Sequence, residues 1–301
     1  MTKVSLVCYH YLARHDEFAK IRGHSKLQFQ EHLDYYRKNF HFVSVSELLT
    51  GLTESQRTNL LITFDDGLKE HIQTFAPLLE QHGISGVFSV PSCILRGEPA
   101  NPQITRFAES YYGEDEFYNL VSAEITSVFP DHSFLLEEKI SNKTLFKWKL
   151  PIQMARQILL NLYNKYLLPK FPDFMQRIYL SENDIKQMRA SGHVIAVHSD
   201  THPVISRIKK EDQELLSQQI IFPKRELEKL LGEEVNIFTY PHGQKEEIFS
   251  DPAVLQDAGY KFVFTTFQDN TSFNPLSVGR YQSFVADTIQ SLSDNIWTYT
   301  I

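Results

Sequence analysis

The chain has 301 residues, 42% of them hydrophobic and 22% charged, as in a globular protein that buries a large core. Its net charge of −7 and pI near 5.9 argue against nucleic acid or an anionic membrane as the main partner. No apolar run reaches transmembrane length, and the N-terminus lacks a signal-peptide pattern, so we expect a cytoplasmic location without stable membrane insertion. The two cysteines, Cys8 and Cys93, are predicted to be buried free thiols.

Short apolar runs predict the β-strands. They cover residues 4–9, 60–64, 86–90, 194–197, 235–240, 262–265 and 276–278. Most are apolar at nearly every position, which is typical of parallel strands buried on both faces. Segments of helical periodicity lie between many of them, namely residues 27–36 after a cap at Ser25, and residues 69–81, 182–190 and 209–231, which end near Gly83, Gly192 and Gly232. This alternation predicts parallel α/β architecture, either a barrel or an open sheet.

Polar residues follow the predicted strands at the points where they end. In chain order they are His10, Asp65 with Asp66, Ser92, His198, His242 and Arg280. Catalytic groups of α/β barrels collect at the carboxyl ends of the strands, whereas an open sheet uses one crevice. The spread of these residues over most strand ends therefore favours a barrel.

One long segment, residues 97–178, interrupts the alternation and is too long for an ordinary connection. It begins with proline-containing loop sequence and continues with helical pattern, so we predict a largely helical insertion. Its many aromatic residues either form a small core of their own or contribute to a lid over a sugar site. They are Phe107, Tyr111, Tyr112, Phe117, Tyr118, Phe129, Phe134, Phe146 and Trp148.

Two motifs at strand ends supply what a hydrolytic metal centre needs. Asp65 and Asp66 follow one apolar strand, and His198 and His202 follow another. Each motif alone has a plainer explanation, since Asp-Asp-Gly is common in turns and helix caps, and histidines four apart are often packed or exposed. Pro203 disfavours a helical position for His202. Together the four side chains offer three ligands, an open coordination position and a spare carboxylate as base.

These segments resemble the polysaccharide deacetylase family, the NodB-like proteins of carbohydrate esterase family 4. The resemblance rests on residues 63–67 and 198–203, and it extends to Tyr9-His10 and to residues 29–49, 180–195 and 238–243. It implies a single domain over residues 1–301, a distorted (β/α)₇ barrel with the helical insertion at about 97–178. It also implies one divalent metal, Zn²⁺ or another such as Co²⁺ or Ni²⁺.

Carried over by this resemblance, Asp66, His198 and His202 would bind the metal, and Asp65 would be the catalytic base. Tyr240, Pro241 and His242 would lie in the substrate site, with a backbone N–H near His242 stabilising the oxyanion. The chemistry is consistent, because a zinc-type ion lowers the pKa of water from about 15.7 toward about 7. A carboxylate close to the ion but not bound to it can then accept a proton.

Departures from the family pattern concern the groups around the base and the acid. Thr239 stands where an arginine orients the base, and Arg280 could supply that charge from another strand end. The late leucine-and-histidine motif and the aspartate-tryptophan motif are not recognisable. His10 or His242 could donate the proton in place of the missing acid, because imidazole titrates near neutrality. Packing or hydrogen bonding to substrate is an equally plausible role for each.

The sequence thus predicts a metal-dependent hydrolase that removes N-acetyl groups from an amino sugar or polysaccharide. A second hypothesis keeps the site and changes the substrate to a lipid-linked or nucleotide sugar or a cyclic ureide or imide, as the absence of an export signal suggests. A third is an inactive carbohydrate-binding protein, because fold alone does not establish chemistry. The sequence specifies neither the sugar nor the oligomeric state.

Overall fold

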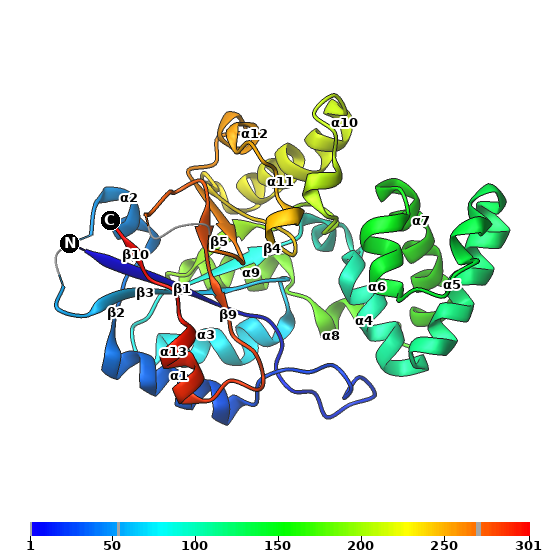
Figure 1. Cartoon of the computed structure of the whole chain (residues 1–301). Helices are drawn as coiled ribbons and strands as arrows, with labels where there is room; N and C mark the ends of the chain where they lie inside the picture. Colours follow the sequence, from blue (N-terminus) through cyan, green and yellow to red (C-terminus); the bar gives the residue numbers. More distant parts are fainter. Residues whose placement is uncertain (1, 53–54, 269–271) are drawn as a thin grey trace.

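The computed structural model describes residues 2–52, 55–268 and 272–301, and its centre is a nearly closed barrel of parallel strands (Figure 1). The parallel order is β1 (Lys3–Tyr9), β3 (Thr58–Phe64), β4 (Gly86–Val90), β5 (Val194–Val197), β6 (Ile237–Thr239), β7 (Phe262–Thr265) and β8 (Val278–Gly279). β9 (Tyr281–Gln282) then pairs with β1, so the sheet returns to its first strand. Short β2 (Phe40–Phe42) adds to β3, and β10 (Tyr299–Thr300) pairs antiparallel with β1.

The strand that closes the barrel is divided into two short strands around Arg280. Residues 278–279 pair with β7, residues 281–282 pair with β1, and Arg280 between them is fully buried. Gly279 is required here, since a Cβ atom would lie 2.0 Å from the carbonyl oxygen of Phe267. The strand expected over residues 276–278 overlaps β8 only at Val278, because residues 276–277 form a turn, and the division at Arg280 was not predicted.

The barrel interior changes from apolar to polar along the strands. Alternate residues at one end form a separate hydrophobic cluster that includes Leu6, Leu61, Val87, Ala196 and Ile237. Because side chains two residues apart point to the same face of a strand, the next inward layer is polar. It consists of Cys8, Thr63, Ser89, His198 and Thr239. The carboxyl ends of the strands therefore carry the buried polar groups.

Helices cover the outside of the barrel and follow the predicted pattern closely in places. The helices of the barrel part are α1 (Lys26–Asn39), α2 (Val45–Thr50), α3 (Ala76–Glu80), α9 (Glu182–Ala190), α10 (Gln213–Leu216), α11 (Phe222–Leu231), α12 (Ala253–Asp257) and α13 (Ile289–Asn295). The cap at Ser25 is confirmed, since its hydroxyl accepts from the N–H of Gln28 at 3.0 Å. The stop at Gly232 is confirmed too, in left-handed conformation.

Other elements differ from expectation. The segment predicted as one helix over residues 209–231 begins at Gln213, where Asp212 caps it, and contains a π-helical stretch, Ser217–Ile221, before α11. The helix predicted over 69–81 likewise starts as a π-helical turn, His71–Phe75. Strands β2 and β10 were not predicted, because runs of two or three residues give too little periodicity to recognise.

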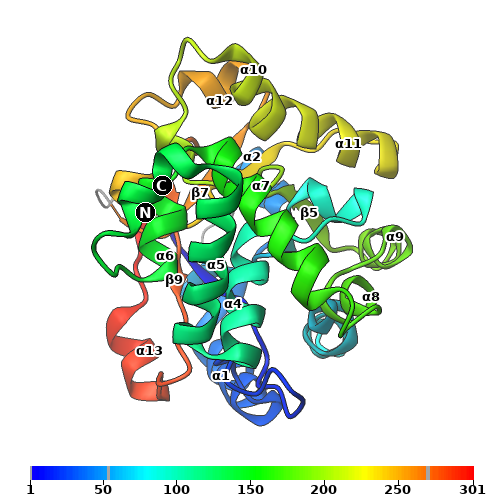
Figure 2. The same ribbon diagram turned by 90° about the vertical axis from the view of Figure 1, so that its right-hand side faces the viewer.

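Between β4 and β5 the chain forms a group of helices, α4 (Asn101–Tyr112), α5 (Glu114–Val128), α6 (Asn142–Thr144), α7 (Ile152–Leu162) and α8 (Phe174–Ile178). Figure 1 shows α4 to α7 at the side toward which β1 points, and Figure 2 shows them in front of the barrel. Most of the aromatic residues here pack, and Phe107 and Phe117 are buried in the main core. In the described part of the chain, no helix is long and apolar enough to cross a membrane.

Candidate active site

The turn after β3 presents Asp65 and Asp66 at the mouth of the barrel. The N–H of Asp65 donates to the carbonyl of Tyr9 at 3.1 Å, which continues the strand ladder for one residue. Asp66 then takes a left-handed conformation with φ of 81°, and Gly67 follows with φ of 62°. This reversal ends the strand and leaves both carboxylates buried at its tip.

The loop after β5 carries the two histidines and is held by the segment after β4. His198 donates its N–H to the carbonyl of Val90, and the carbonyls of Ser199 and Asp200 accept from the N–H groups of Ser92 and Cys93. Asp200 is buried and accepts from the hydroxyl of Ser92 and from Arg96. Its carboxylate therefore fixes the loop, which leaves the imidazoles free for other partners.

Backbone strain is concentrated at this site. Among the described residues, only four other than glycine have positive φ angles: Asp66 (81°), Ser199 (58°), His202 (65°) and His242 (66°). Left-handed backbone costs non-glycine residues on the order of 1–3 kcal/mol each and persists only where the surroundings enforce it. All four residues lie in the loops after β3, β5 and β6, so the fold tolerates this strain around a single point.

Asp66, His198 and His202 form a compact set of metal-ligand type. The Oδ1 atom of Asp66 lies 3.5 Å from Nε2 of His198 and 3.4 Å from Nε2 of His202. Two ligands bound at about 2.0–2.1 Å to a tetrahedral ion lie roughly 3.3–3.4 Å apart. The Nδ1 atom of His198 donates to the carbonyl of Thr239 at 2.9 Å, so the lone pair of the ring is on Nε2, facing Asp66. The residues present therefore fit a divalent cation.

Asp65 is paired with Arg280, which lies between β8 and β9. The guanidinium donates to Oδ1 at 2.8 Å and to Oδ2 at 2.7 Å, and it also donates to the hydroxyl of Thr63 and the carbonyl of Thr265. Arg280 thus supplies the positive charge beside Asp65 that Thr239 cannot supply. The structure brings this residue to Asp65, as the sequence suggested for a charge from another strand end.

The electrostatics keep both carboxylates ionised. Burial would raise the pKa of Asp65, but the charges of Arg280 and His198 outweigh it and hold the pKa well below its usual value. For Asp66, burial would raise the pKa, but the neighbouring imidazoles of His198 and His202 outweigh it and lower the pKa. Burial would lower the pKa of His198, but Asp65 and Asp66 raise it.

His10 and His242 lie at opposite sides of this cluster. His10 Nε2 is 4.0 Å from Oδ2 of Asp65. His242 packs edge-on against His202, with ring centroids 4.6 Å apart. Burial lowers the pKa of His10, opposed by Asp66 and Asp65, whereas burial and the neighbouring His202 hold the pKa of His242 well below its usual value. Both rings line the cavity in front of the cluster.

A second set of ligand-type atoms, from Cys8, His10 and Asp65, has a different character. Asp65 is already engaged by Arg280 through both oxygens, and the Cys8 thiol donates to Oδ2 at 3.4 Å. Burial raises the pKa of Cys8 well above its usual value, so the thiol keeps its proton. Because a metal ligand must be a thiolate, this set fits a hydrogen-bonded support for Asp65 better than a cation site.

Tyr240 and Pro241, expected in the substrate site, do not line the cavity. The hydroxyl of Tyr240 accepts from the N–H of Phe249, and its ring packs against Phe238. Strand alternation explains this correction, because Thr239 faces the barrel interior and its neighbour Tyr240 faces outward. Of the three residues predicted to contact substrate in this motif, only His242 reaches the cavity.

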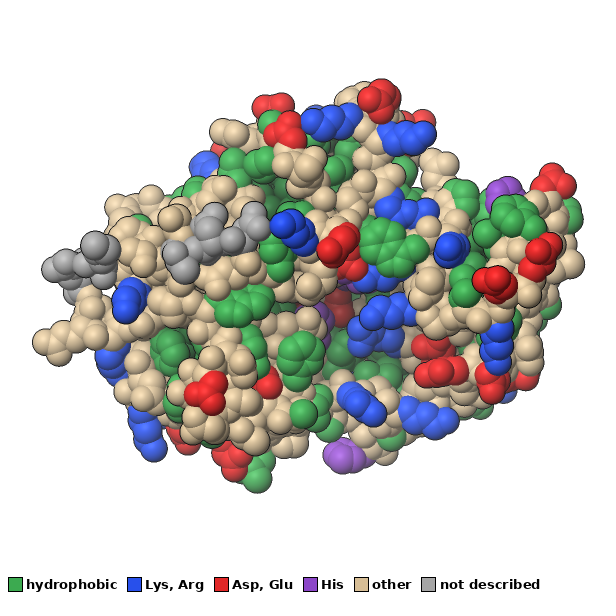
Figure 3. Space-filling view, in the orientation of Figure 1, with side chains coloured by type: hydrophobic (Ala, Val, Ile, Leu, Met, Phe, Trp, Pro, Cys, Tyr) green, Lys and Arg blue, Asp and Glu red, His purple; other side chains and the backbone are tan. Residues whose placement is uncertain are grey.

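The cavity has a volume of about 440 Å³ and lies between the barrel and the helices α4, α6 and α7. Figure 3 shows Lys and Arg side chains gathered around the hollow at this place. Sequence reasoning missed the lining residues that the helices contribute, which include Arg106, Lys143 and Lys147. Of the aromatic residues between 97 and 178, a range described throughout, Phe146 alone lines the cavity, so most of them serve packing.

Comparisons with known proteins agree with this picture. Residues 134–263 match the family model described as polysaccharide deacetylase. The match includes His198 and His202, and Asp65 and Asp66 lie upstream of it. No curated protein matches the chain by sequence.

Solved structures of low sequence identity share the fold. The deacetylase PplD from Streptococcus pyogenes, in complex with acetate, is 14% identical with a TM-score of 0.61, covering 98% of each chain. A de-N-acetylase from Aggregatibacter actinomycetemcomitans is 14% identical with a TM-score of 0.62, covering 97% of this chain and 99% of that one. IcaB from Ammonifex degensii is 20% identical with a TM-score of 0.55, covering 97% and 96%. The predicted barrel fold is thereby confirmed.

Proposed function

We propose that this chain, whose residues 134–263 match the polysaccharide deacetylase family, is a metal-dependent amide-bond hydrolase that removes N-acetyl groups from an amino sugar. The observation that carries the proposal is the Asp66, His198 and His202 set with ligand-like separations, beside a carboxylate held in place by Arg280. Three protein ligands with an open position are the pattern of catalytic rather than structural zinc. The resemblance predicted from the sequence is confirmed at the level of the family.

Asp66, His198 and His202 would hold the cation. Bound there, a divalent ion such as Zn²⁺ supplies Lewis-acid polarisation and lowers the pKa of water. The chain's own contribution is to present these ligands at strained, fixed positions, so that little reorganisation is needed. The carbonyl of Thr239 orients the ring of His198 for this role.

Asp65 is assigned as the general base. It would accept the proton of the water that attacks the acetamide carbonyl, and its pairing with Arg280 keeps it ionised and correctly oriented. Arg280 touches Asp65 and not the reacting atoms, so we assign it a positioning role. Pairing with Arg280 also keeps Asp65 from turning away toward the cation.

His10 is the favoured proton donor to the leaving amine. Its Nε2 lies 4.0 Å from Oδ2 of Asp65, so one bridging water would carry the proton accepted by Asp65 to His10, which would pass a proton to the nitrogen of the breaking C–N bond. One water and one amide then give acetate and the protonated amine, with both residues restored. His242 packs against His202 on the other side of the cluster, which favours contact with substrate for this residue.

The test is acetate release by purified, metal-loaded protein, with N-acetyl chitooligosaccharides as the first substrates. Activity should disappear with a chelator and return with Zn²⁺, Co²⁺ or Ni²⁺. Asp65→Asn should keep the metal and lose turnover, whereas His198→Ala should lose both. Full activity in both variants would refute the assignment.

A non-polymeric substrate is the second candidate. It is favoured by the helices α4, α6 and α7, which line one side of the cavity, and by the cavity volume of about 440 Å³, near the lower end for small-molecule sites. Comparing chitooligosaccharides with small acetylated sugars of equal chemistry would separate the two. A rate that rises steeply with oligomer length would favour the polymer.

A further inference from the structure

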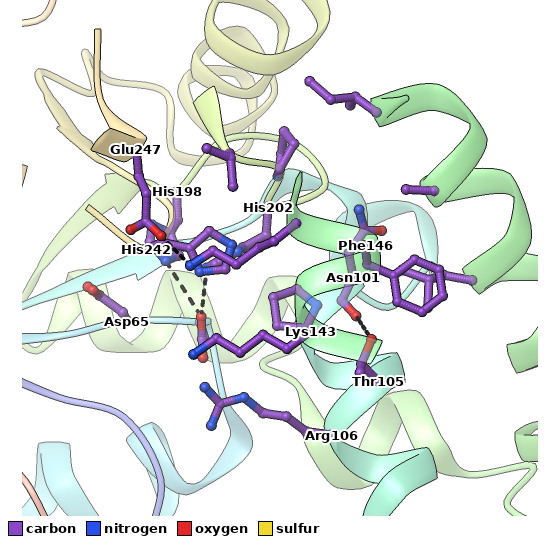
Figure 4. Close-up of a pocket in the computed structure, with 18 of the residues that line it drawn as sticks. Asp65, Asn101, Thr105, Arg106, Lys143, Phe146, His198, His202, His242 and Glu247 are labelled. Atoms are coloured by element: carbon purple, nitrogen blue, oxygen red, sulfur yellow. Dashed lines mark hydrogen bonds and ion pairs between the residues drawn. The ribbon is translucent and has the colours of Figure 1, made fainter. Parts of the chain in front are cut away.

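Two cations face the candidate active site from the helical segment without acidic partners. Arg106 is on α4 and Lys143 on α6, and both are exposed and line the cavity. Figure 4 shows their side chains pointing from these helices toward the carboxylate and imidazole cluster. In the described part of the chain, neither side chain has a carboxylate within ion-pair distance. Their charges are therefore available to a ligand.

The other cations of the cavity are already engaged. Lys147 forms an ion pair with Glu247, and Arg207 donates to the carbonyls of Lys147 and Leu150 at 2.7 and 2.8 Å. The remaining acidic group of the helical wall, Glu109, accepts from Asn142 at 2.9 Å. Lys147 and Arg207 therefore have partners within the protein, whereas Arg106 and Lys143 have no ion-pair partner among the described residues.

Arg106 is held ready for a planar anionic partner. Its guanidinium lies over the ring of Tyr11, 5.2 Å from the centroid. The hydroxyl of Tyr11 accepts from Gln103, one turn before Arg106 on the same helix, at 2.9 Å. A stacked guanidinium keeps its donors directed outward, which reduces the entropy lost when it binds an anion through two hydrogen bonds.

The basic surface continues beyond the cavity. A second hollow of about 580 Å³ shares Arg106 and Glu109 with the first and adds Lys20, Arg22 and Glu114. Arg106 therefore stands at the border of two hollows, and the second of them is lined by Lys20, Arg22 and Arg106 against the carboxylates of Glu109 and Glu114. A ligand whose negative charge lies outside its sugar ring could therefore extend from the first hollow into the second.

We propose that the acetylated sugar bound by this site carries a phosphate group, and that Arg106 and Lys143 bind that phosphate. This rests on the proposed deacetylase function and names its substrate class. Phosphate suits this pair because arginine offers paired donors to its oxygens while lysine supplies a point charge. A neutral glycan would leave Arg106 and Lys143 without an anionic group to bind on the ligand.

Matched substrates test the proposal. Acetate release is measured for the neutral methyl glycoside of N-acetylglucosamine and for N-acetylglucosamine 1-phosphate, at two salt concentrations. The phosphate compound should be preferred at least tenfold in kcat/KM, and the preference should shrink at high salt. Equal kcat/KM for both compounds would overturn the proposal while leaving the deacetylase function standing.

Variants identify the residues responsible. Arg106→Gln and Lys143→Gln should each raise KM for the phosphate compound about 10- to 100-fold, with kcat and the neutral substrate little changed. Arg106→Lys should restore part of the loss. Arg225→Gln and Lys149→Gln change exposed cations outside the cavity and serve as matched controls. If all four glutamine variants behave alike, specific phosphate binding is excluded.

A binding measurement separates this inference from catalysis. Calorimetric titration of the Asp65→Asn protein with N-acetylglucosamine 1-phosphate needs no turnover, and Arg106→Gln in that background should weaken binding at least tenfold. Because phosphate also binds divalent cations, the titration is repeated with His198→Ala, in which dependence on Arg106 should persist. Dependence on Arg106 without any deacetylation would uphold the phosphate site and refute the proposed reaction.

The source of the phosphate is distinguished by three ligands that share it: the sugar 1-phosphate, UDP-N-acetylglucosamine and a short-chain polyprenyl diphosphate N-acetylglucosamine. Tighter binding of the second or third assigns the nucleotide-linked or lipid-linked sugar. Failure of all three to bind better than the neutral glycoside overturns the proposal.

Discussion

The charged groups that face the cavity are paired at the barrel mouth, whereas two of those on the helical segment are not. At the barrel mouth every catalytic candidate has a partner: Asp65 is bound by Arg280, and Asp66 contacts both histidines. Across the cavity, α4 and α6 present Arg106 and Lys143 without acidic partners. Paired, strained and buried groups suit chemistry that needs fixed geometry. Unpaired, accessible cations suit recognition. From this comparison we expect reaction and selectivity to reside on different parts of the chain, so that each can be altered separately.

Removing a proposed metal-binding side chain should have the largest effect on activity. His198→Ala should lower kcat/KM about a thousandfold or more, because the polarisation supplied by a bound cation is worth several kcal/mol. Metal content, measured by mass spectrometry after dialysis, should fall in parallel. His82→Ala, at an exposed position, is the control. A variant that keeps stoichiometric metal and full activity would remove His198 from the ligand set.

Asp65→Asn should lower kcat by roughly 100- to 10,000-fold, the range expected for loss of a general base. Metal binding should persist, since Asp65 is not a member of the Asp66, His198 and His202 set. The phosphate-dependent binding attributed to Arg106 should also persist, which would show that the two sides act independently. Loss of metal in this variant would instead make Asp65 a ligand.

Replacing Arg280 tests the positioning role. Arg280→Met leaves Asp65 buried without its partner, and breaking a buried pair costs about 3–5 kcal/mol of unfolding free energy. Without the guanidinium, the effect of burial on Asp65 is no longer outweighed, so its pKa rises. The acid limb of the kcat/KM profile should therefore move to higher pH, and Arg280→Lys should restore it partly. An unchanged profile would contradict the positioning role.

The sequence was sufficient where function depends on short motifs at strand ends. Asp65, Asp66, His198 and His202 follow apolar runs whose boundaries are clear, and parallel strands bring such ends together. Arg280 was recognised as a charge at a strand end. Its pairing with Asp65 depends on the interruption between β8 and β9, which hydrophobic periodicity does not reveal. Arg106 and Lys143 were missed because the way in which a helical segment docks depends on long-range packing. Tyr240 was misplaced by a single step of strand alternation.

The contact between the two regions should have a moderate effect when weakened. Arg207 donates to the carbonyls of Lys147 and Leu150 and thereby ties the loop after β5 to the helical wall. Arg207→Met should loosen this wall and raise KM about tenfold, with kcat changed less, since two hydrogen bonds from a charged group are lost. Steady-state kinetics and metal content check this. A larger effect on kcat than on KM would place Arg207 among the groups that act on the reaction.

Mild acid should weaken the barrel side through His24, with the smallest effect considered. His24 donates to the carbonyl of Phe284 and contacts Ser283, so it links the first loop to the closing segment. Burial and the nearby His32 lower its pKa to about 4. The unfolded chain binds this proton near pH 6.5 and the folded chain does so only near pH 4, so between these values the unfolded state holds more protons.

The unfolding free energy therefore falls as the pH falls through this window, by about 1 kcal/mol per such group between pH 6.5 and 5.5. Urea unfolding at both values should show a smaller difference for His24→Gln than for the parent protein. His82→Gln, at an exposed position, should leave the difference unchanged. If His24→Gln keeps the full dependence on pH, the proton is taken up elsewhere, and the link between the first loop and the closing segment does not set the acid stability of the barrel.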